Sequence, residues 1–83
     1  MKLYKISNNL VRMVFEESSN DQDRIEIIFS YDEPISFYYM GLHITTENIW
    51  GPTTGKHIKR FTPDNGKLAP NDVFKRLFKT YFY

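Results

Sequence analysis

The sequence contains no cysteine, which excludes both a disulfide framework and a metal site built from thiolates. The stability of the fold must therefore come from packing alone. The absence of cysteine is also compatible with a reducing cytosol. The sequence also lacks any apolar run near the ~20 residues that a membrane-spanning helix needs. No continuous apolar segment follows the N-terminal lysine, as a secretion signal would require. We therefore expect a soluble, unexported protein that makes no contact with a membrane.

The length limits the chain to one domain, residues 1–83, near the size at which a single core becomes marginal. Hydrophobic residues make up 41% of the sequence, and seven Phe, six Tyr and one Trp bring the aromatic share to 17%. Each buried ring hides roughly 150 to 250 Å² from water. The rings therefore supply enough apolar surface for a folded domain.

The net charge of +1 hides an uneven distribution along the chain. Residues 1–55 carry eight acidic and four basic groups, a net −4, whereas residues 56–83 carry two acidic and seven basic groups, a net +5. Such a dipole can steer an approaching partner, although two ordinary solvated faces would produce the same counts.

Apolar and polar side chains alternate with a period of two in several segments, the pattern of strands with one face on a core. The alternation predicts strands over residues 3–7, 10–16, 24–30, 34–40 and 42–46. Asn8 with Asn9, residues 31–33, and Met40 with Gly41 supply the turns. The polar residues 17–22 are expected to form an exposed, mobile loop. The result is an antiparallel meander of four or five strands.

The alternation also assigns side chains to faces of the sheet. Ile35 is expected to point the same way as Phe37 and Tyr39, and Pro34 should begin their strand because it has no N–H to donate to a ladder. In the last strand, Leu42 and Ile44 share one face, and His43 and Thr45 share the other. A sheet with one apolar face needs a cover.

The C-terminal segment supplies that cover, because its apolar residues recur at the spacing of one helical stripe. These residues are Val73, Phe74, Leu77, Phe78 and Tyr81. Asn71 or Asp72 is expected to cap the first turn. The fold class predicted is therefore α+β, an antiparallel sheet of four or five strands with the C-terminal helix packed on one face.

Residues 53–61 fit either a helix or a strand. A helix capped by Thr53 or Thr54 would place Ile58 and Phe61 inward, whereas the alternation around Ile58 also permits a strand. We favour the helix, although Gly55 weakens that prediction. Residues 63–66 form a turn by composition.

Residues 51–56, GPTTGK, share glycines, threonines and a lysine with the phosphate-binding loop of nucleotide triphosphatases. The spacing differs, because three residues rather than four separate Gly51 from Gly55, and His57 stands where a hydroxyl would bind magnesium. We therefore do not expect a nucleotide triphosphatase. The threonine hydroxyls, the N–H groups of a helix start and Lys56 could hold one anion, or they could simply cap the helix.

His43 and His57 are the only imidazoles, and they stand 14 residues apart without clustered carboxylates. We interpret His43 as a half-buried polar residue and His57 as a hydrogen-bonding or anion-facing group. For nucleophilic catalysis, Ser30 or Ser36 would need a histidine within reach, and no motif supports this. We expect no enzyme, no metal ion and no cofactor. An enzyme acting through His57 and a Thr is the weakest alternative.

Seven basic residues lie in the C-terminal part of the chain and suggest a phosphate-attracting surface: Lys56, Lys59, Arg60, Lys67, Lys75, Arg76 and Lys79. The rings of the predicted C-terminal helix lie on its core stripe and are not available to stack on bases. This surface therefore predicts weak, salt-sensitive binding of nucleic acid without sequence specificity.

Six large side chains cannot all be buried in so small a core: Tyr31, Tyr38, Met40, Trp50, Tyr81 and Tyr83. Exposed Tyr, Trp and Met are enriched at protein interfaces. This composition favours a protein partner or a homo-oligomer, although small aromatic-rich domains also leave rings partly exposed.

Residues 29–61 contain a pattern that resembles small uncharacterised phage and prophage proteins. The residues that carry it are Ser30 to Ser36 (SYDEPIS), Gly41, Ile44 to Thr46 (ITT), and Thr53 to Ile58 (TTGKHI). In those proteins a Ser-Tyr-x-x-Pro strand leads through a hairpin into Thr-Thr-x-Lys-His. The resemblance implies a phage or mobile-element origin and provides no catalytic residues.

We therefore expect a small phage protein that docks on a protein target in the host cytoplasm, such as a host-defence nuclease complex, and that acts like an anti-CRISPR inhibitor. The alternative is a nucleic-acid-associated accessory protein that uses the basic C-terminal half. The predicted contact residues are Tyr38, Met40, Trp50, Lys56, His57 and Arg60.

Overall fold

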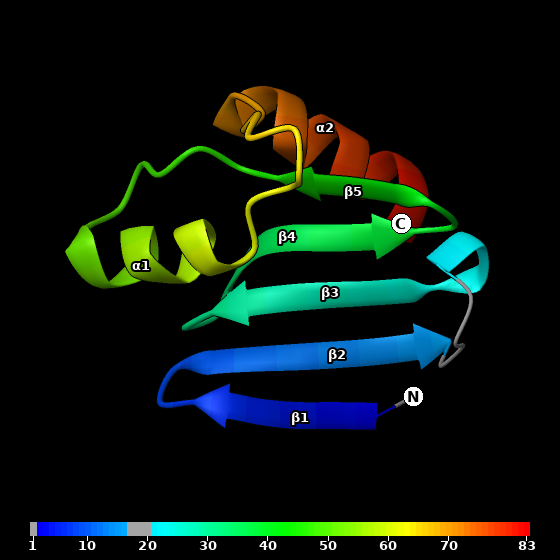
Figure 1. The fold of residues 1–83 in the computed structure, drawn as a ribbon, viewed down its shortest axis with the longest axis horizontal. Coiled ribbons are helices and arrows are strands. Elements are labelled where there is room, and N and C mark those ends of the chain that lie inside the picture. Colours follow the sequence, from blue (N-terminus) through cyan, green and yellow to red (C-terminus); the bar gives the residue numbers. More distant parts are fainter. Residues whose placement is uncertain (1, 17–20) are drawn as a thin grey trace.

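The computed structural model describes residues 2–16 and 21–83, which form an α+β fold with a five-stranded antiparallel sheet and two α-helices (Figure 1). This confirms the predicted fold class. The elements are β1 (Lys2–Ser7), β2 (Leu10–Glu16), β3 (Ile25–Ser30), β4 (Glu33–Tyr39), β5 (Leu42–Thr45), α1 (Pro52–Arg60) and α2 (Asn71–Phe82), with a single 3-10 turn at Asp21–Asp23.

The sheet is a simple meander in which each strand pairs with the next along the chain, in the order β1-β2-β3-β4-β5. The predicted turns are confirmed by residues with positive φ, Asn9 at 62° and Gly41 at 91°. Tyr31 also has a positive φ of 57°, which is unusual for a residue with a bulky side chain. Its N–H donates to the Asn9 carbonyl oxygen at 2.6 Å, and this bond joins the two turns at one end of the sheet.

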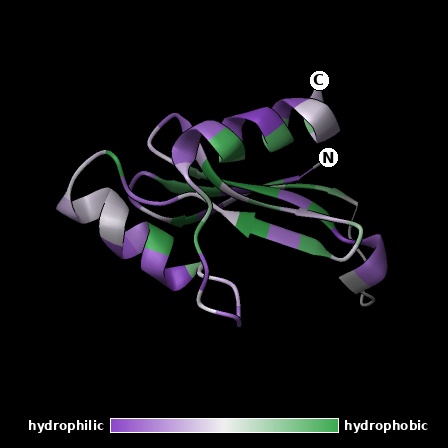
Figure 2. Cartoon of the chain, turned by 90° about the horizontal axis from the view of Figure 1, so that it is seen from above, coloured by the Kyte–Doolittle hydropathy of each residue, from purple (hydrophilic) through white to green (hydrophobic). Residues whose placement is uncertain are grey.

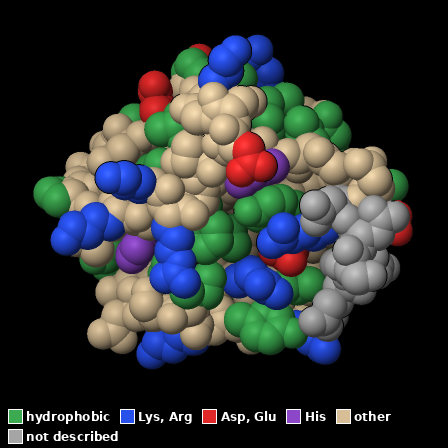
Figure 3. All heavy atoms as spheres, viewed as in Figure 1, with side chains coloured by type: hydrophobic (Ala, Val, Ile, Leu, Met, Phe, Trp, Pro, Cys, Tyr) green, Lys and Arg blue, Asp and Glu red, His purple; other side chains and the backbone are tan. Residues whose placement is uncertain are grey.

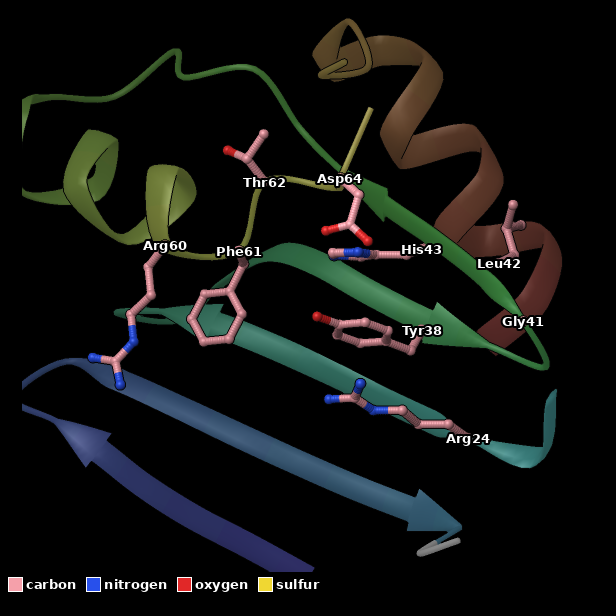
Figure 4. A pocket seen from close by; sticks show the side chains of 9 residues that line it. All are labelled: Arg24, Tyr38, Gly41, Leu42, His43, Arg60, Phe61, Thr62 and Asp64. Atoms are coloured by element: carbon pink, nitrogen blue, oxygen red, sulfur yellow. The ribbon is translucent and has the colours of Figure 1, made fainter. Parts of the chain in front are cut away.

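The two helices lie on opposite faces of the sheet (Figure 2). We call the face on which α1 lies the front face, and Figure 4 shows the Tyr38 and His43 side chains on it. Helix α1 packs on one end of the front face, and α2 packs on the back face. The prediction of a single covered face was therefore incomplete. Each face has its own small hydrophobic cluster.

A bulge in β4 explains the front cluster. Ile28 pairs with Ser36 and Phe29 pairs with Pro34, so Ile35 is left over between the two pairs. Ile35 packs with Ile28, Leu10 and Ile58 under α1 instead of joining Phe37 on the back face. The predicted strict alternation was wrong at this residue. The bulge lets one strand contribute to both clusters.

Helix α2 covers the back face with the predicted apolar stripe. Phe74 is fully buried, and its ring lies 5.6 Å from that of Phe37, centroid to centroid. Phe78, Tyr81 and Phe82 also place their rings within 6.2 Å of Phe37. The predicted cap was wrong. The residue before the helix is Pro70, no side chain caps it, and Asn71 instead donates from Nδ2 to the Thr46 hydroxyl.

The segment that could have been a strand is helix α1, with Ile58 buried as predicted. The predicted threonine cap was wrong, because Gly51 precedes the helix, Pro52 begins it, and Thr54 is buried against the sheet. Gly55 leaves room for the Asn48 side chain, whose Nδ2 would lie only 2.9 Å from an added Cβ. Any side chain at this position would displace the exposed Asn48 side chain from the place where it bonds to the Gly51 carbonyl oxygen.

The chain returns from α1 to the sheet before entering α2. Gly66 has a φ of 70° and donates to the Pro63 carbonyl oxygen at 2.8 Å, which confirms the predicted turn. Ala69 then pairs in parallel with Thr46 at the end of β5. The predicted mobile loop falls mostly on residues 17–20, which lie outside the described residues. Within the described residues, neither helix has the length and apolar character needed to cross a bilayer.

The dependence of the back cluster on α2 can be measured by truncating Phe74. We expect Phe74→Ala to lower the free energy of unfolding by about 3–5 kcal/mol, because it removes a buried ring and leaves a cavity. Urea unfolding followed by circular dichroism measures this change. The control is Tyr83→Ala in the same segment, where the side chain is 89% exposed and the expected change is below about 0.5 kcal/mol. Equal losses in the two variants would show that α2 does not form this core.

Candidate functional site

Three side chains form a stack on the exposed part of the front face. The Tyr38 and His43 rings are nearly parallel, with centroids 4.0 Å apart. The Arg24 guanidinium carbon lies 3.7 Å from the centre of the other face of the Tyr38 ring. Figure 4 shows the stack running across β3, β4 and β5. Tyr38 and His43 meet because the strand register pairs them directly, and close cross-strand pairs favour stacking.

A buried carboxylate holds the basic end of the stack. Glu26 is buried, and its Oε2 lies 2.9 Å from Arg24 Nη2 and 3.6 Å from Arg12 Nε. A buried charge is costly unless it is paired, and here two cations face one carboxylate. The pairing with Glu26 therefore holds Arg24 in place against Tyr38.

A network of hydroxyl groups holds the other end of the stack. Thr45 Oγ1 donates to the Phe61 carbonyl oxygen at 2.7 Å and lies 2.7 Å from Ser36 Oγ. His43 Nε2 lies 3.0 Å from Ser36 Oγ and 3.2 Å from Thr45 Oγ1. Because the Thr45 proton is used by Phe61, the network is complete when His43 carries its proton on Nε2 and donates it to these hydroxyls. The network connects β4 and β5 to the end of α1.

The environment keeps both rings of the stack neutral. Burial lowers the pKa of His43, and the nearby positive charge of Arg24 lowers it further. Burial also raises the pKa of Tyr38, although Arg24 opposes that shift. At neutral pH the stack is therefore an uncharged pair of rings between the cation Arg24 and the carboxylate of Asp64, which lies over His43 in Figure 4.

The stack forms one wall of a hollow of about 480 Å³, which we call the stack hollow. Its opposite wall is the end of α1 and the segment that follows. The lining residues are Arg24, Tyr38, Gly41, Leu42, His43, Arg60, Phe61, Thr62 and Asp64. In Figure 4 the Tyr38 hydroxyl points across the hollow toward the Phe61 ring. The lining thus combines two cations, one carboxylate and an aromatic surface.

A second hollow of about 350 Å³ lies at the other end of α1, and we call it the Trp50 hollow. It is mainly apolar and is lined by Ser30, Tyr31, Glu33, Trp50, Gly51, Pro52, Thr53 and Thr54. Trp50 is 38% exposed and Tyr31 is 51% exposed. The Asn48 side chain fixes the approach to the helix, because Oδ1 accepts the Trp50 N–H at 2.9 Å and Nδ2 donates to the Gly51 carbonyl oxygen at 3.1 Å.

Both serines considered for catalysis have a histidine partner, which the sequence analysis did not find. Ser30 Oγ lies 2.7 Å from His57 Nδ1 and 3.1 Å from Thr54 Oγ1. Ser36 Oγ lies 3.0 Å from His43 Nε2. Ser30 is only 1% exposed and Ser36 is fully buried, so an incoming substrate cannot reach either oxygen in this conformation. The pairs act here as polar links, the first between α1 and β3 and the second between β4 and β5.

The structure brings five of the six predicted contact residues together around α1. Lys56, His57 and Arg60 belong to the helix, Trp50 lies just before it, and Tyr38 faces Arg60 across the stack hollow. The sixth, Met40, is 55% exposed at the β4–β5 turn, at the opposite end of the sheet from α1. His57 is half-buried because its ring turns toward Ser30.

The basic residues of the C-terminal part do not form one surface. Lys56, Lys59 and Arg60 are exposed on α1, on the front face. The exposed cations of α2 lie on the other side of the sheet: Lys75, Arg76 and Lys79. Arg60 of the first group lines the stack hollow, and the remaining basic residue, Lys67, is exposed and lines a third, smaller hollow of about 170 Å³. Within residues 2–16 and 21–83 there is no cluster of His, Asp and Glu that could hold a metal ion.

Comparison with known proteins gave one family match. The model described as "Family of unknown function (DUF8033)" matches residues 1–76. No curated protein and no solved structure matches the chain.

The lowered pKa of His43 predicts how stability depends on pH. The unfolded chain binds a proton at His43 more readily than the folded protein does, so acidification favours unfolding. We expect the free energy of unfolding to be highest above the ordinary histidine pKa of about 6.5 and to fall as the pH drops through the lower pKa of the folded state. Urea unfolding across this range, with NMR titration of the His43 ring, measures the effect.

The matched control for this experiment is His43→Gln, which keeps a hydrogen-bond donor and removes the titrating group. We expect the acid-induced loss to be smaller in this variant than in the wild type, even if the variant is less stable throughout. The same pH dependence in both proteins, or a His43 pKa at or above the ordinary value, would contradict the role of burial at this residue.

Proposed function

Because the chain belongs to the DUF8033 family, a family of unknown function, we propose a function from the structure. The protein is a non-enzymatic binding protein that docks on a protein partner through a surface centred on α1. We call this surface the α1 surface. It consists of the exposed side of α1 and the Trp50 hollow at its N-terminal end.

The observation that carries this proposal is the pair of exposed rings, Trp50 and Tyr31, beside an apolar hollow. Trp and Tyr are the residues that most often dominate binding energy at protein interfaces, and they do so when they fill or border a pocket. Trp50 is the single tryptophan of the sequence, and its partly exposed ring leaves apolar surface that a partner could bury.

The charge of α1 indicates the chemistry of the partner. The helix contains no acidic residue, and Lys56, Lys59 and Arg60 are exposed. Within the part of the chain that the structure describes, none of the three forms an ion pair. Figure 3 shows Lys and Arg side chains gathered on the front face, over the region of α1 and the neighbouring strands. A partner that inserts an apolar side chain into the Trp50 hollow and surrounds it with acidic groups would complement this surface.

The α1 surface is also rigid, which lowers the entropic cost of binding. Ser30 bonds to both Thr54 and His57, so two turns of the helix are attached to the end of β3. Ile58 is buried in the front cluster, and Thr45 holds the Phe61 carbonyl oxygen at the end of the helix. Asn48 holds the backbone of Trp50 before the helix begins.

The resemblance of residues 29–61 to small phage and prophage proteins extends the proposal. We place the protein in the cytoplasm of a bacterial host, where it would bind a component of a defence complex, such as a CRISPR effector nuclease, and block it. This step rests on the resemblance and on analogy with other small phage proteins that redirect larger machines. The acidic, apolar partner surface required by α1 would then lie on the host protein.

A nucleic acid is the alternative partner, because the same three cations of α1 could contact phosphates. Such binding would be governed by counterion release and would weaken steeply as salt is raised. The two exposed rings at the Trp50 hollow favour the protein partner instead, since an apolar hollow has no role in contacts with phosphates.

The docking proposal is tested by Trp50→Ala in an affinity purification from phage-infected cells, followed by measurement of binding to the purified partner. Removing an interface tryptophan typically costs about 2 kcal/mol or more, so we expect the dissociation constant to rise about thirtyfold. The control is Tyr83→Ala, which removes an exposed ring on the other face of the sheet and should leave binding unchanged.

The two candidate partners give different results in the same experiment. Binding that survives nuclease treatment and is weakened by Trp50→Ala supports the protein partner, and the exposed cations of α1 then add a moderate dependence on salt. Binding that is lost on nuclease treatment and is insensitive to Trp50→Ala supports the nucleic acid and overturns the docking proposal. Equal losses for Trp50→Ala and Tyr83→Ala would also overturn it.

A further inference from the structure

We propose that the stack hollow binds a small molecule that carries a phosphate monoester on a hydroxylated body, such as a sugar phosphate or a nucleoside monophosphate. The site is separate from the Trp50 hollow, because the two lie at opposite ends of α1 and share no lining residue. The proposal does not depend on the identity of the protein partner.

The charges of the stack hollow select an anion. Arg60 lines it from the end of α1, and within the described residues it forms no ion pair. Arg24 lines it from the position just before β3, where its guanidinium also contacts the Glu26 carboxylate. In Figure 4 the Arg24 guanidinium lies below the Tyr38 ring and the Arg60 guanidinium lies beyond the Phe61 ring, so the two cations flank this part of the hollow. Guanidinium groups are well suited to phosphate, which they contact through two parallel hydrogen bonds.

The anion end of the site is held in place before a ligand arrives. Arg24 is fixed between the Tyr38 ring and the Glu26 carboxylate, and Tyr38 is in turn stacked on His43. His43 is anchored by the hydroxyls of Ser36 and Thr45. Fixed donors lose little entropy on binding, so this arrangement favours a specific contact over diffuse attraction.

The opposite end of the hollow suits hydroxyl groups. The Asp64 carboxylate lies over the His43 ring at this end (Figure 4), and a carboxylate accepts hydrogen bonds from hydroxyl or amino groups. The Phe61 ring supplies an apolar side wall, against which a sugar or a base can pack. A phosphate at the arginines and hydroxyls at Asp64 would use both ends of the site.

The size and the geometry favour a small molecule over a nucleic-acid chain. The volume of about 480 Å³ lies within the usual range of small-ligand sites, roughly 300 to 1,000 Å³. Both faces of the Tyr38 ring are already covered, one by Arg24 and the other by His43. The ring is therefore not available to stack on successive bases, as an extended single strand would require.

The experiment is isothermal titration of the full chain with ribose 5-phosphate, adenosine monophosphate, inorganic phosphate and ribose, each up to millimolar concentration. We expect the two phosphate monoesters to bind, inorganic phosphate to bind more weakly, and ribose not to bind. If inorganic phosphate binds with the same affinity as the esters, the hollow recognises only an anion, and the assigned ligand class is overturned. No binding of either ester would overturn the proposal outright.

A matched pair of variants tests the position of the ligand. Arg60→Gln removes a cation that lines the hollow, and Lys59→Gln removes the adjacent exposed cation that does not. A hydrogen bond to a charged group contributes about 1.5–3 kcal/mol, so we expect Arg60→Gln to raise the dissociation constant at least tenfold. Lys59→Gln should change it less than about threefold. Equal effects would indicate nonspecific attraction and contradict the proposed site.

A third variant separates the two ends of the site. Asp64→Asn removes the negative charge from the lining of the hollow and weakens the acceptor for hydroxyl groups. We expect it to strengthen the binding of inorganic phosphate and to narrow the advantage of ribose 5-phosphate over inorganic phosphate. An unchanged ratio of the two affinities would show that Asp64 does not contact the ligand body, and it would overturn the proposed orientation.

Discussion

The hydrogen bond from the Thr45 hydroxyl to the Phe61 carbonyl oxygen is the contact on which both candidate sites depend. It joins the end of α1 to the last strand of the sheet. The same hydroxyl belongs to the network that orients His43, and His43 supports Tyr38 and Arg24. The bond is partly buried, and losing it would remove the polar link between the end of α1 and β5. The position of α1 and the shape of the stack hollow are therefore determined together.

Because the two helices lie on opposite faces, the two faces of the sheet differ in how much of their surface is buried. The back face is devoted to stability, since Phe37 is surrounded by the rings of α2. The front face is only partly covered by α1, and its remainder carries charged and polar side chains. A chain of 83 residues thus leaves much of one sheet face available for binding while the other face supplies most of the aromatic core.

Local periodicity was sufficient to predict most of the fold. The strands, the turns at Asn9 and Gly41, and the apolar stripe of α2 all depend on residues close together in the sequence. The candidate site could be predicted only in part, because its contacts depend on register. The stack of Arg24, Tyr38 and His43 forms only when three strands are aligned, and Ser30 meets His57 across 27 residues. The roles predicted for Thr54 and Asn71 as caps were wrong for the same reason, since tertiary hydrogen bonds compete with local ones.

The extra residue in β4 has a consequence for how sequences of this kind can change. The bulge leaves Ile35 as an extra residue between the pairs formed by Pro34 and Ser36. Ile35 therefore packs in the front cluster, whereas Phe37 packs in the back cluster. Exchanging one apolar side chain for another would alter a local fit. Losing Ile35 would instead remove the bulge, so that Ser36 follows Pro34 in a regular ladder and Phe37 still pairs with Ile27 on the back face. The front cluster would then lose one of its four buried side chains, so the cost of such a deletion falls on the face that α1 covers.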